Sequence, residues 1–233
     1  MKRILSVASL CLVALAPALA HSGERNLNSS LRGDYAFSGE ASCLGTRADD
    51  ALSDFHAHNP GAYITTFAVE GVLRFNGDGT GTTVKGRAIT INHNTNRDQG
   101  GNFLSLGTAM VSTFNGDFNY SVAHDRSIRI EREPLAITTI VGPTANTPDA
   151  STIWKGIKFD GHVSQDFKTL SIATAASDSN PPGLVLEYGY RTGAAEPYQT
   201  RACHRARTLV KISGGDKHDK HDEQLSVYPF SRR

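Results

Sequence analysis

The side chains best suited to chemistry in this sequence are histidines at three places. If a leader is removed after Ala20, the chain begins at His21, whose amine and imidazole can together chelate Cu(II). His56 and His58 stand two residues apart, so both rings would share one face of a strand and could meet one zinc or copper ion. His218 and His221 lie among aspartates, where weak metal binding competes with a solvated tail. We favour the ordinary alternatives, a frayed terminus, a surface loop and a solvated tail, and expect no cofactor.

Catalytic motifs are missing from the sequence. It holds no G-x-S-x-G elbow, and "GDGTGTT" lacks the lysine and helix of a phosphate loop. Glu70 and Glu187 fall opposite the apolar rows of their strands, which predicts that both point outward. The tripeptide "RGD" at residues 32–34 runs straight into a strand, so we treat it as chance. No catalytic residue is assigned.

The first twenty residues have the pattern of a secretory signal peptide. Lys2 and Arg3 precede an apolar run, and Ala18-Leu19-Ala20 is a small-residue cleavage site. Removing them lowers Lys plus Arg from 24 to 22 against 23 Asp plus Glu, a net charge of −1. We therefore expect an exported, periplasmic or extracellular protein without a transmembrane segment, and no nucleic-acid partner.

Two cysteines remain after that cleavage. Cys11 leaves with the signal, while Cys43 and Cys203 stay, 160 residues apart. In an exported chain they most simply form one disulfide. By restricting the unfolded chain, this bond would stabilise the folded protein by about 5 kcal/mol. Two free thiols are the alternative.

The rest of the chain alternates apolar and polar residues in short runs between Gly, Asn and Asp turns. "TFAVEGVLRF", "GDFNYSV" and "GIKFDGHV" are examples. We expect about eight to ten strands in one all-β domain over residues 31–212, closed as an antiparallel up-and-down barrel. A two-sheet sandwich is the alternative. A flexible segment, residues 21–30, precedes the domain, and a polar tail with an apolar end, residues 213–233, follows it.

The order of several segments resembles a known group. "LRGDYAFSG", "GVLRFNGDGTGT", "GDFNYSVAHDRSIRI", "FDGHVSQDFKTLSI" and "TRACHRARTLVKI" are similar to the exported bacterial calycin-like barrels, lipocalin-like and allene-oxide-cyclase-like. Tyr35 stands where a lipocalin has tryptophan. The resemblance implies the barrel, but no catalytic or ligand residue.

A barrel of about eight strands holds either packed side chains or one small ligand. The aromatic residues expected to face its lumen are Tyr35, Phe37, Phe67, Phe75, Tyr120, Phe159, Tyr188 and Tyr190. We therefore predict an exported barrel that binds a small apolar molecule. The alternatives are a lumen-based cyclase or isomerase, a copper site at His21, and a structural or interaction protein whose aromatics fill a solid core. The sequence does not predict an oligomeric state.

Overall fold

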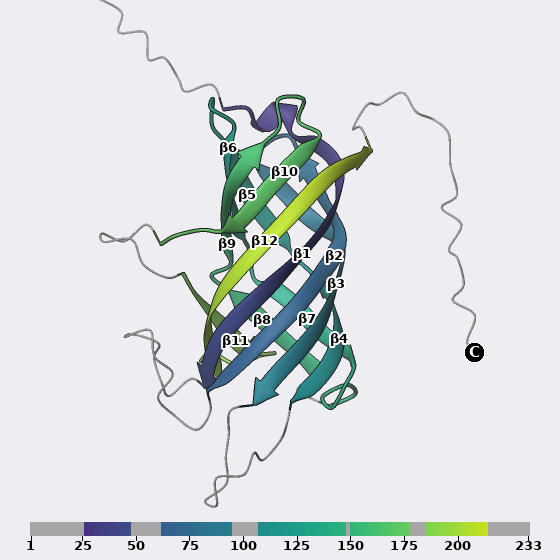
Figure 1. The fold of residues 1–233 in the computed structure, drawn as a ribbon, viewed down its shortest axis with the longest axis vertical. Coiled ribbons are helices and arrows are strands. Elements are labelled where there is room, and N and C mark those ends of the chain that lie inside the picture. Colours follow the sequence, from purple (N-terminus) through teal and green to yellow (C-terminus); the bar gives the residue numbers. More distant parts are fainter. Residues whose placement is uncertain (1–25, 48–61, 95–106, 148–149, 178–184, 214–233) are drawn as a thin grey trace, which may run out of the picture.

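The protein is a closed antiparallel β-barrel (Figure 1). The computed structural model describes residues 26–47, 62–94, 107–147, 150–177 and 185–213. The elements are η1 (Asn28–Ser30), β1 (Arg32–Arg47), β2 (Tyr63–Asn76), β3 (Thr80–Asn94), β4 (Thr108–Asn115), β5 (Asp117–Val122), β6 (Ser127–Arg132), β7 (Leu135–Val141), β8 (Ser151–Lys155), β9 (Lys158–Val163), β10 (Thr169–Thr174), β11 (Leu186–Arg191) and β12 (Gln199–Ser213). They form one twelve-stranded sheet that β1 and β12 close into a ring. The predicted barrel is confirmed, and a single closed ring excludes the two-sheet sandwich.

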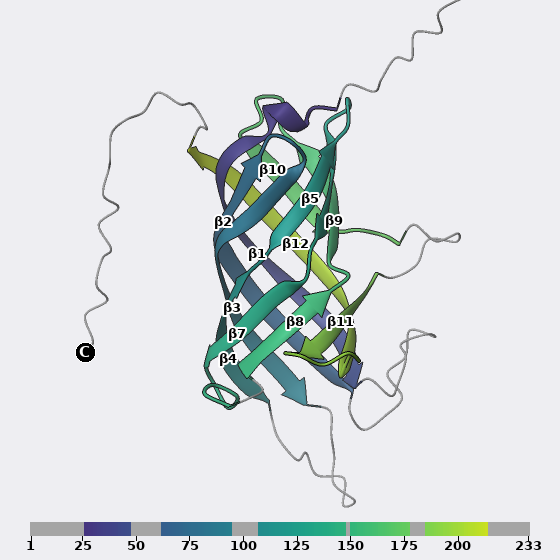
Figure 2. The ribbon, with the colours of Figure 1, turned by 180° about the vertical axis from the view of Figure 1, so that it is seen from behind.

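The twelve strands make an eight-stranded barrel at each level. β1, β2, β3 and β12 run its full length (Figures 1 and 2). In the upper half of Figure 1 the ring is completed by β5, β6, β9 and β10, and in the lower half by β4, β7, β8 and β11. The short strands are halves of four interrupted strands, β4 with β5, β6 with β7, β8 with β9, and β10 with β11. The chain therefore meanders up and down as predicted, with four interruptions.

Residues unsuited to a continuous ladder stand at three of the four interruptions. Gly116, with a φ of 151°, separates β4 from β5, and Pro134, which has no N–H to donate, lies between β6 and β7. Gly156, with a φ of 83°, follows the last residue of β8. At each interruption one strand ends and another begins. The upper and lower halves of the barrel are therefore lined by different short strands.

The upper half is filled by an aromatic core. Phe75 stands at its centre, with ring centroids 5.2 Å from Tyr35, 5.2 Å from Phe118 and 5.0 Å from Tyr120, all edge to face. Gly81 leaves room for this packing, because a Cβ there would lie 2.2 Å from the ring of Phe118. The upper half therefore holds packed side chains.

The short helix η1 covers the upper end of the barrel. The side chain of Asn28 accepts a hydrogen bond from the backbone N–H of Val122 at 2.8 Å, and the Tyr120 hydroxyl donates to the carbonyl of Leu31 at 2.9 Å. The backbone N–H of Leu27 also donates to Val122 at 2.9 Å. Residues 27–30, which the sequence placed in a flexible segment, are thus anchored to β5. Buried polar groups of this kind leave no periodic signal in a sequence.

The predicted disulfide between Cys43 and Cys203 is present. The two cysteines are direct partners in the ladder between β1 and β12, at the seam that closes the ring. The bond joins the first and last strands of the barrel.

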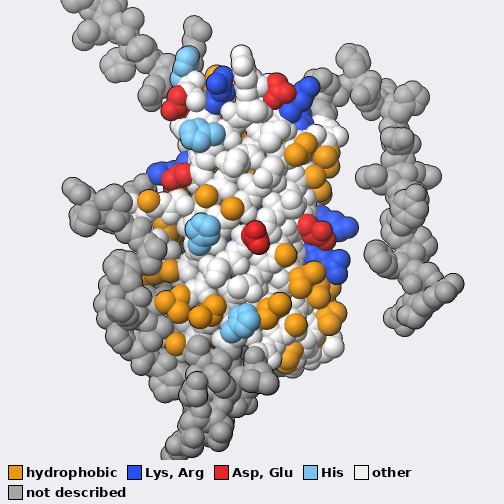
Figure 3. Space-filling view, viewed as in Figure 1, with side chains coloured by type: hydrophobic (Ala, Val, Ile, Leu, Met, Phe, Trp, Pro, Cys, Tyr) orange, Lys and Arg blue, Asp and Glu red, His pale blue; other side chains and the backbone are white. Residues whose placement is uncertain are grey.

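The outer surface carries both apolar and charged side chains. In Figure 3 hydrophobic side chains gather over the lower half of the barrel. Ile64, Ile89 and Ile91, each between 42% and 50% exposed, lie on the outer face of β2 and β3. Among the described residues, no helix is long and apolar enough to span a lipid bilayer.

Candidate functional site

A cavity of about 660 Å³ lies inside the lower half of the barrel. Its wall is made by the lower parts of β2, β3, β4, β7, β8, β11 and β12, together with Pro143 and Thr144 of the loop after β7. The volume is within the range of sites for small molecules. The two halves of the barrel are therefore different, one packed and one hollow.

The lining of the cavity combines hydroxyl groups with apolar surface. Its hydroxyl side chains are Thr65, Thr90, Thr108, Ser112, Thr139, Thr144, Thr152, Tyr63 and Tyr198. Its apolar side chains are Phe67, Met110, Ile137, Pro143 and Trp154. Asn92, Gln199, Arg191 and Arg201 complete it, and none of these described lining residues is acidic. Such a wall suits a molecule with an apolar body and several hydrogen-bonding groups.

Arg201 is one of the two arginines that line the cavity. Its guanidinium lies 3.4 Å from the ring centroid of Trp154, a stacked cation–π contact. Its Nε donates a hydrogen bond to Oε2 of Glu187 at 2.9 Å. The wall of the cavity therefore includes a cation that is already positioned by an aromatic ring and a carboxylate.

Glu187 joins two arginines. Nη2 of Arg205 donates to Oε2 of Glu187 at 2.6 Å, and Nη1 of Arg205 also donates to Oε1. The carboxylate is 1% exposed, so the prediction that Glu187 points outward is wrong. Burial opposes ionisation, but the charges of Arg205 and Arg201 outweigh it and hold the pKa of Glu187 below its usual range.

Two further buried cations lie beyond this triad. Arg132 donates a hydrogen bond to the hydroxyl of Thr83 and lies 5.5 Å from the ring of Phe118. Burial and the charge of Arg205 lower its pKa to about 10. Arg207 lies 4.7 Å from the ring of Phe159 and 5.4 Å from that of Phe37. We name Arg132, Arg201, Arg205, Arg207 and Glu187 the arginine layer.

Sequence reasoning missed the arginine layer although β12 carries a signal for it. Positions 201, 203, 205, 207 and 209 alternate in the segment "RACHRARTL" and share one face. Cys203 and Leu209 are 7% and 0% exposed, so the arginines between and beside them must also point inward. Charged residues are mostly exposed in folded proteins, but arginines that are paired with a carboxylate or stacked on aromatic rings can lie inside.

The predicted lumen residues are found in three places. Phe67 lines the cavity. Tyr35, Phe37, Phe75, Tyr120 and Phe159 belong to the packed core. Tyr188 and Tyr190 do not belong to either group: Tyr188 is 37% exposed, and the ring of Tyr190 lies 4.4 Å from the ammonium of Lys155. The inward placement of Tyr188 is wrong because Glu187 takes the inward position in β11.

The five histidines that could hold a metal, His21, His56, His58, His218 and His221, lie outside the described residues. Within the ranges that the structure describes, no group of three or more His, Cys, Asp or Glu side chains is placed to hold a metal ion. The copper and zinc hypotheses stay predictions.

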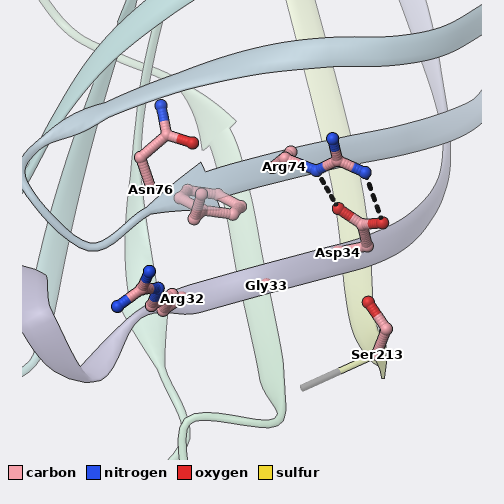
Figure 4. Close-up of a pocket in the computed structure, with 7 residues that line it drawn as sticks. Arg32, Gly33, Asp34, Arg74, Asn76 and Ser213 are labelled. Carbon is pink, nitrogen blue, oxygen red and sulfur yellow. Dashed lines mark hydrogen bonds and ion pairs between the residues drawn. The ribbon is translucent and has the colours of Figure 1, made fainter. Parts of the chain in front are cut away.

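A second, shallower pocket of about 390 Å³ lies where β1, β2 and the end of β12 meet (Figure 4). Arg74 faces Asp34 across it, with Nε donating at 2.7 Å and Nη2 at 2.9 Å to the two carboxylate oxygens. Asp34 is the last residue of the "RGD" tripeptide, and here it sits within β1 and is held by this pair. The charged groups of Arg74 and Asp34 in the wall of this pocket therefore pair with each other.

Acidification is expected to remove the contribution of Glu187 to stability. Its pKa is lowered in the folded protein, so the unfolded chain takes up a proton first as the pH falls below about 4.5, the ordinary value. The stabilisation is complete above that value and is lost as the pH falls through the lower, folded pKa. Urea unfolding at a series of pH values from 7 to about 3 measures this effect. The free energy of unfolding should fall more steeply with pH for the wild type than for Glu187→Gln. Parallel curves would contradict this assignment.

Comparison with known proteins gives no family. No protein-family model and no curated protein matches the chain. Among solved structures it is similar to "Enduracididine biosynthesis enzyme MppR complexed with the condensation product of pyruvate and imidazole 4-carboxaldehyde", with 13% identity over 76% of this chain and 87% of that one. The TM-score of 0.15 is too low to carry an argument. The antiparallel barrel itself fits, loosely, the calycin-like architecture that the sequence resembles.

Proposed function

We propose that the protein binds a small molecule in the cavity of its lower half and does so without chemical change to it. The observation that supports this most is the cavity itself, about 660 Å³ within a barrel whose other half is packed. The sequence predicted an apolar ligand. We propose instead a ligand with an apolar body and hydrogen-bonding groups, because the wall contains hydroxyl side chains as well as Phe67, Met110 and Trp154.

We propose that this binding takes place outside the cytoplasm. The signal-peptide pattern of residues 1–20 supports export. The disulfide between Cys43 and Cys203 is compatible with an oxidising compartment. An exported barrel of this kind would take up its ligand in the periplasm or outside the cell.

Filling the cavity is expected to weaken binding. Thr90 and Thr108 line it from β3 and β4, and each is followed by an outward residue, Ile91 and Ala109. In the variant Thr90→Phe/Thr108→Phe two rings would enter the cavity. The fluorescence of the neutral dye N-phenylnaphthylamine, which rises in apolar surroundings, measures binding. We expect the dissociation constant to rise by about tenfold or more, a loss of at least about 1.4 kcal/mol.

The matched control is Ile91→Phe/Ala109→Phe, which adds the same rings to the outer face of the same strands. It should bind the dye as the wild type does. Equal loss in both variants, or no saturable binding by the wild type, would refute the proposal.

A further inference from the structure

The interior of the barrel contains more positive than negative charge. Four arginines of the arginine layer are between 1% and 8% exposed, and Glu187 is the one buried carboxylate among the described residues. Glu187 compensates a single charge and is shared between Arg201 and Arg205. Buried charges are expensive unless paired, so the layer favours a further negative charge.

Arg207 is the member of the layer with unmet hydrogen-bonding capacity. It is 6% exposed, and its Nε and Nη1 have no hydrogen-bond partner in the described part of the chain. Its surroundings are cation–π contacts with Phe159 and Phe37, which orient the guanidinium but accept no conventional hydrogen bond from its edge. A guanidinium held in this way presents free donors at a fixed place.

The charged neighbours of Arg207 are mostly cations: Arg132 and Arg205 oppose its charge, and the smaller, opposite effect comes from Glu187. Burial first, and then the charges of Arg132 and Arg205, lower the pKa of Arg207 well below its ordinary value. Arg132 has a neutral partner, the hydroxyl of Thr83. Glu187 is already engaged by Arg201 and Arg205. A hydrogen-bond acceptor for Nε and Nη1 of Arg207 must therefore come from a group other than these side chains.

We propose that Arg207 and Arg132, two members of the arginine layer, form an oxyanion site, in which Arg207 binds a carboxylate or phosphate group beside Arg132. Guanidinium groups prefer such oxygens because each N–H can point at a separate lone pair in a charge-assisted hydrogen bond. Arg207 stands six residues from Arg201 along β12, about 20 Å of strand, and neither Arg207 nor Arg132 is among the residues that line the cavity of the proposed function. The oxyanion site does not depend on that function.

The test is thermal unfolding while chloride is exchanged for acetate or phosphate at constant ionic strength. A ligand at 100 times its dissociation constant should raise the midpoint of the wild type by about 5–10 °C. Arg207→Met keeps an unbranched apolar stem but removes the guanidinium donors, and its midpoint should shift by no more than the general salt effect. Arg87→Met, an exposed arginine on β3, is the matched control and should respond as the wild type does. An equal response from Arg207→Met would overturn the proposal.

A second measurement does not need a variant. Wild-type crystals soaked in selenate should show anomalous density within hydrogen-bond distance of Arg207, and a layer without such density would overturn the proposal.

The free anion and the acidic head of a longer molecule are distinguished by the cavity variant. If a free anion binds, Thr90→Phe/Thr108→Phe keeps the acetate response. If the oxyanion arrives as the head of a cavity ligand, dodecanoate stabilises the wild type and this variant abolishes the effect. Dye binding that persists in Arg207→Met would show that the cavity binds small molecules independently of the oxyanion site.

Discussion

Replacing Cys43 and Cys203 together with alanine is expected to lower the free energy of unfolding by about 5 kcal/mol and the unfolding midpoint by about 10–20 °C. The bond closes a loop of 160 residues, which greatly restricts the unfolded chain. In the folded protein the same two strands are already joined by the ladder between β1 and β12. The loss should therefore come mainly through the unfolded state and leave the fold unchanged.

Guanidinium unfolding of the double variant and of the wild type, each with and without reductant, measures this effect. Reduction should destabilise the wild type nearly as much as the double substitution and should not affect the variant. Circular dichroism at room temperature should show the same strand content in both proteins. A loss below about 1 kcal/mol would contradict the disulfide's role as the tie between the ends of the barrel.

Glu187→Gln is expected to destabilise the protein by about 3–5 kcal/mol, because the change leaves two buried guanidinium groups without a counter-charge. Oε1 and Oε2 of Glu187 together accept hydrogen bonds from Arg201 and Arg205. Glutamine keeps the shape of the side chain but supplies one carbonyl oxygen and places an NH₂ group against the arginines. The unfolding midpoint should fall by about 10 °C.

The control is Glu70→Gln on β2. Glu70 is 67% exposed and lies 3.8 Å from Arg87, so its replacement should change stability by less than about 1 kcal/mol. If Glu187→Gln proves as mild as Glu70→Gln, the buried triad does not hold the barrel together. Differential scanning calorimetry of both variants beside the wild type decides between these results.

The architecture of the barrel could be predicted because it depends on local signals. Alternation along "TFAVEGVLRF" fixes which residues of β2 face inward, and "NGDGTG" forms the turn to β3, where Asp78 accepts hydrogen bonds from Thr80. The disulfide could be predicted because the chain has a signal-peptide pattern and two cysteines outside it. These features need no knowledge of the other strands.

The cavity and the arginine layer could not be predicted in the same way. The space inside a barrel depends on the summed volumes of side chains from eight strands at one level, which no single segment encodes. The prediction for β11 was wrong because Tyr188 and Tyr190, on either side of Gly189, have the pattern of an inward-facing row. Glu187 faces inward instead, where it pairs with arginines of β12. Only the spacing of the arginines from Cys203 carried that information.

The most direct test of the account is a crystal structure of the wild-type protein with N-phenylnaphthylamine bound. The account predicts density for one dye molecule inside the lower half of the barrel, in contact with Thr90, Thr108 and Trp154. Density on the outer surface alone, or a cavity filled by rearranged side chains, would contradict the claim that the protein binds small molecules there.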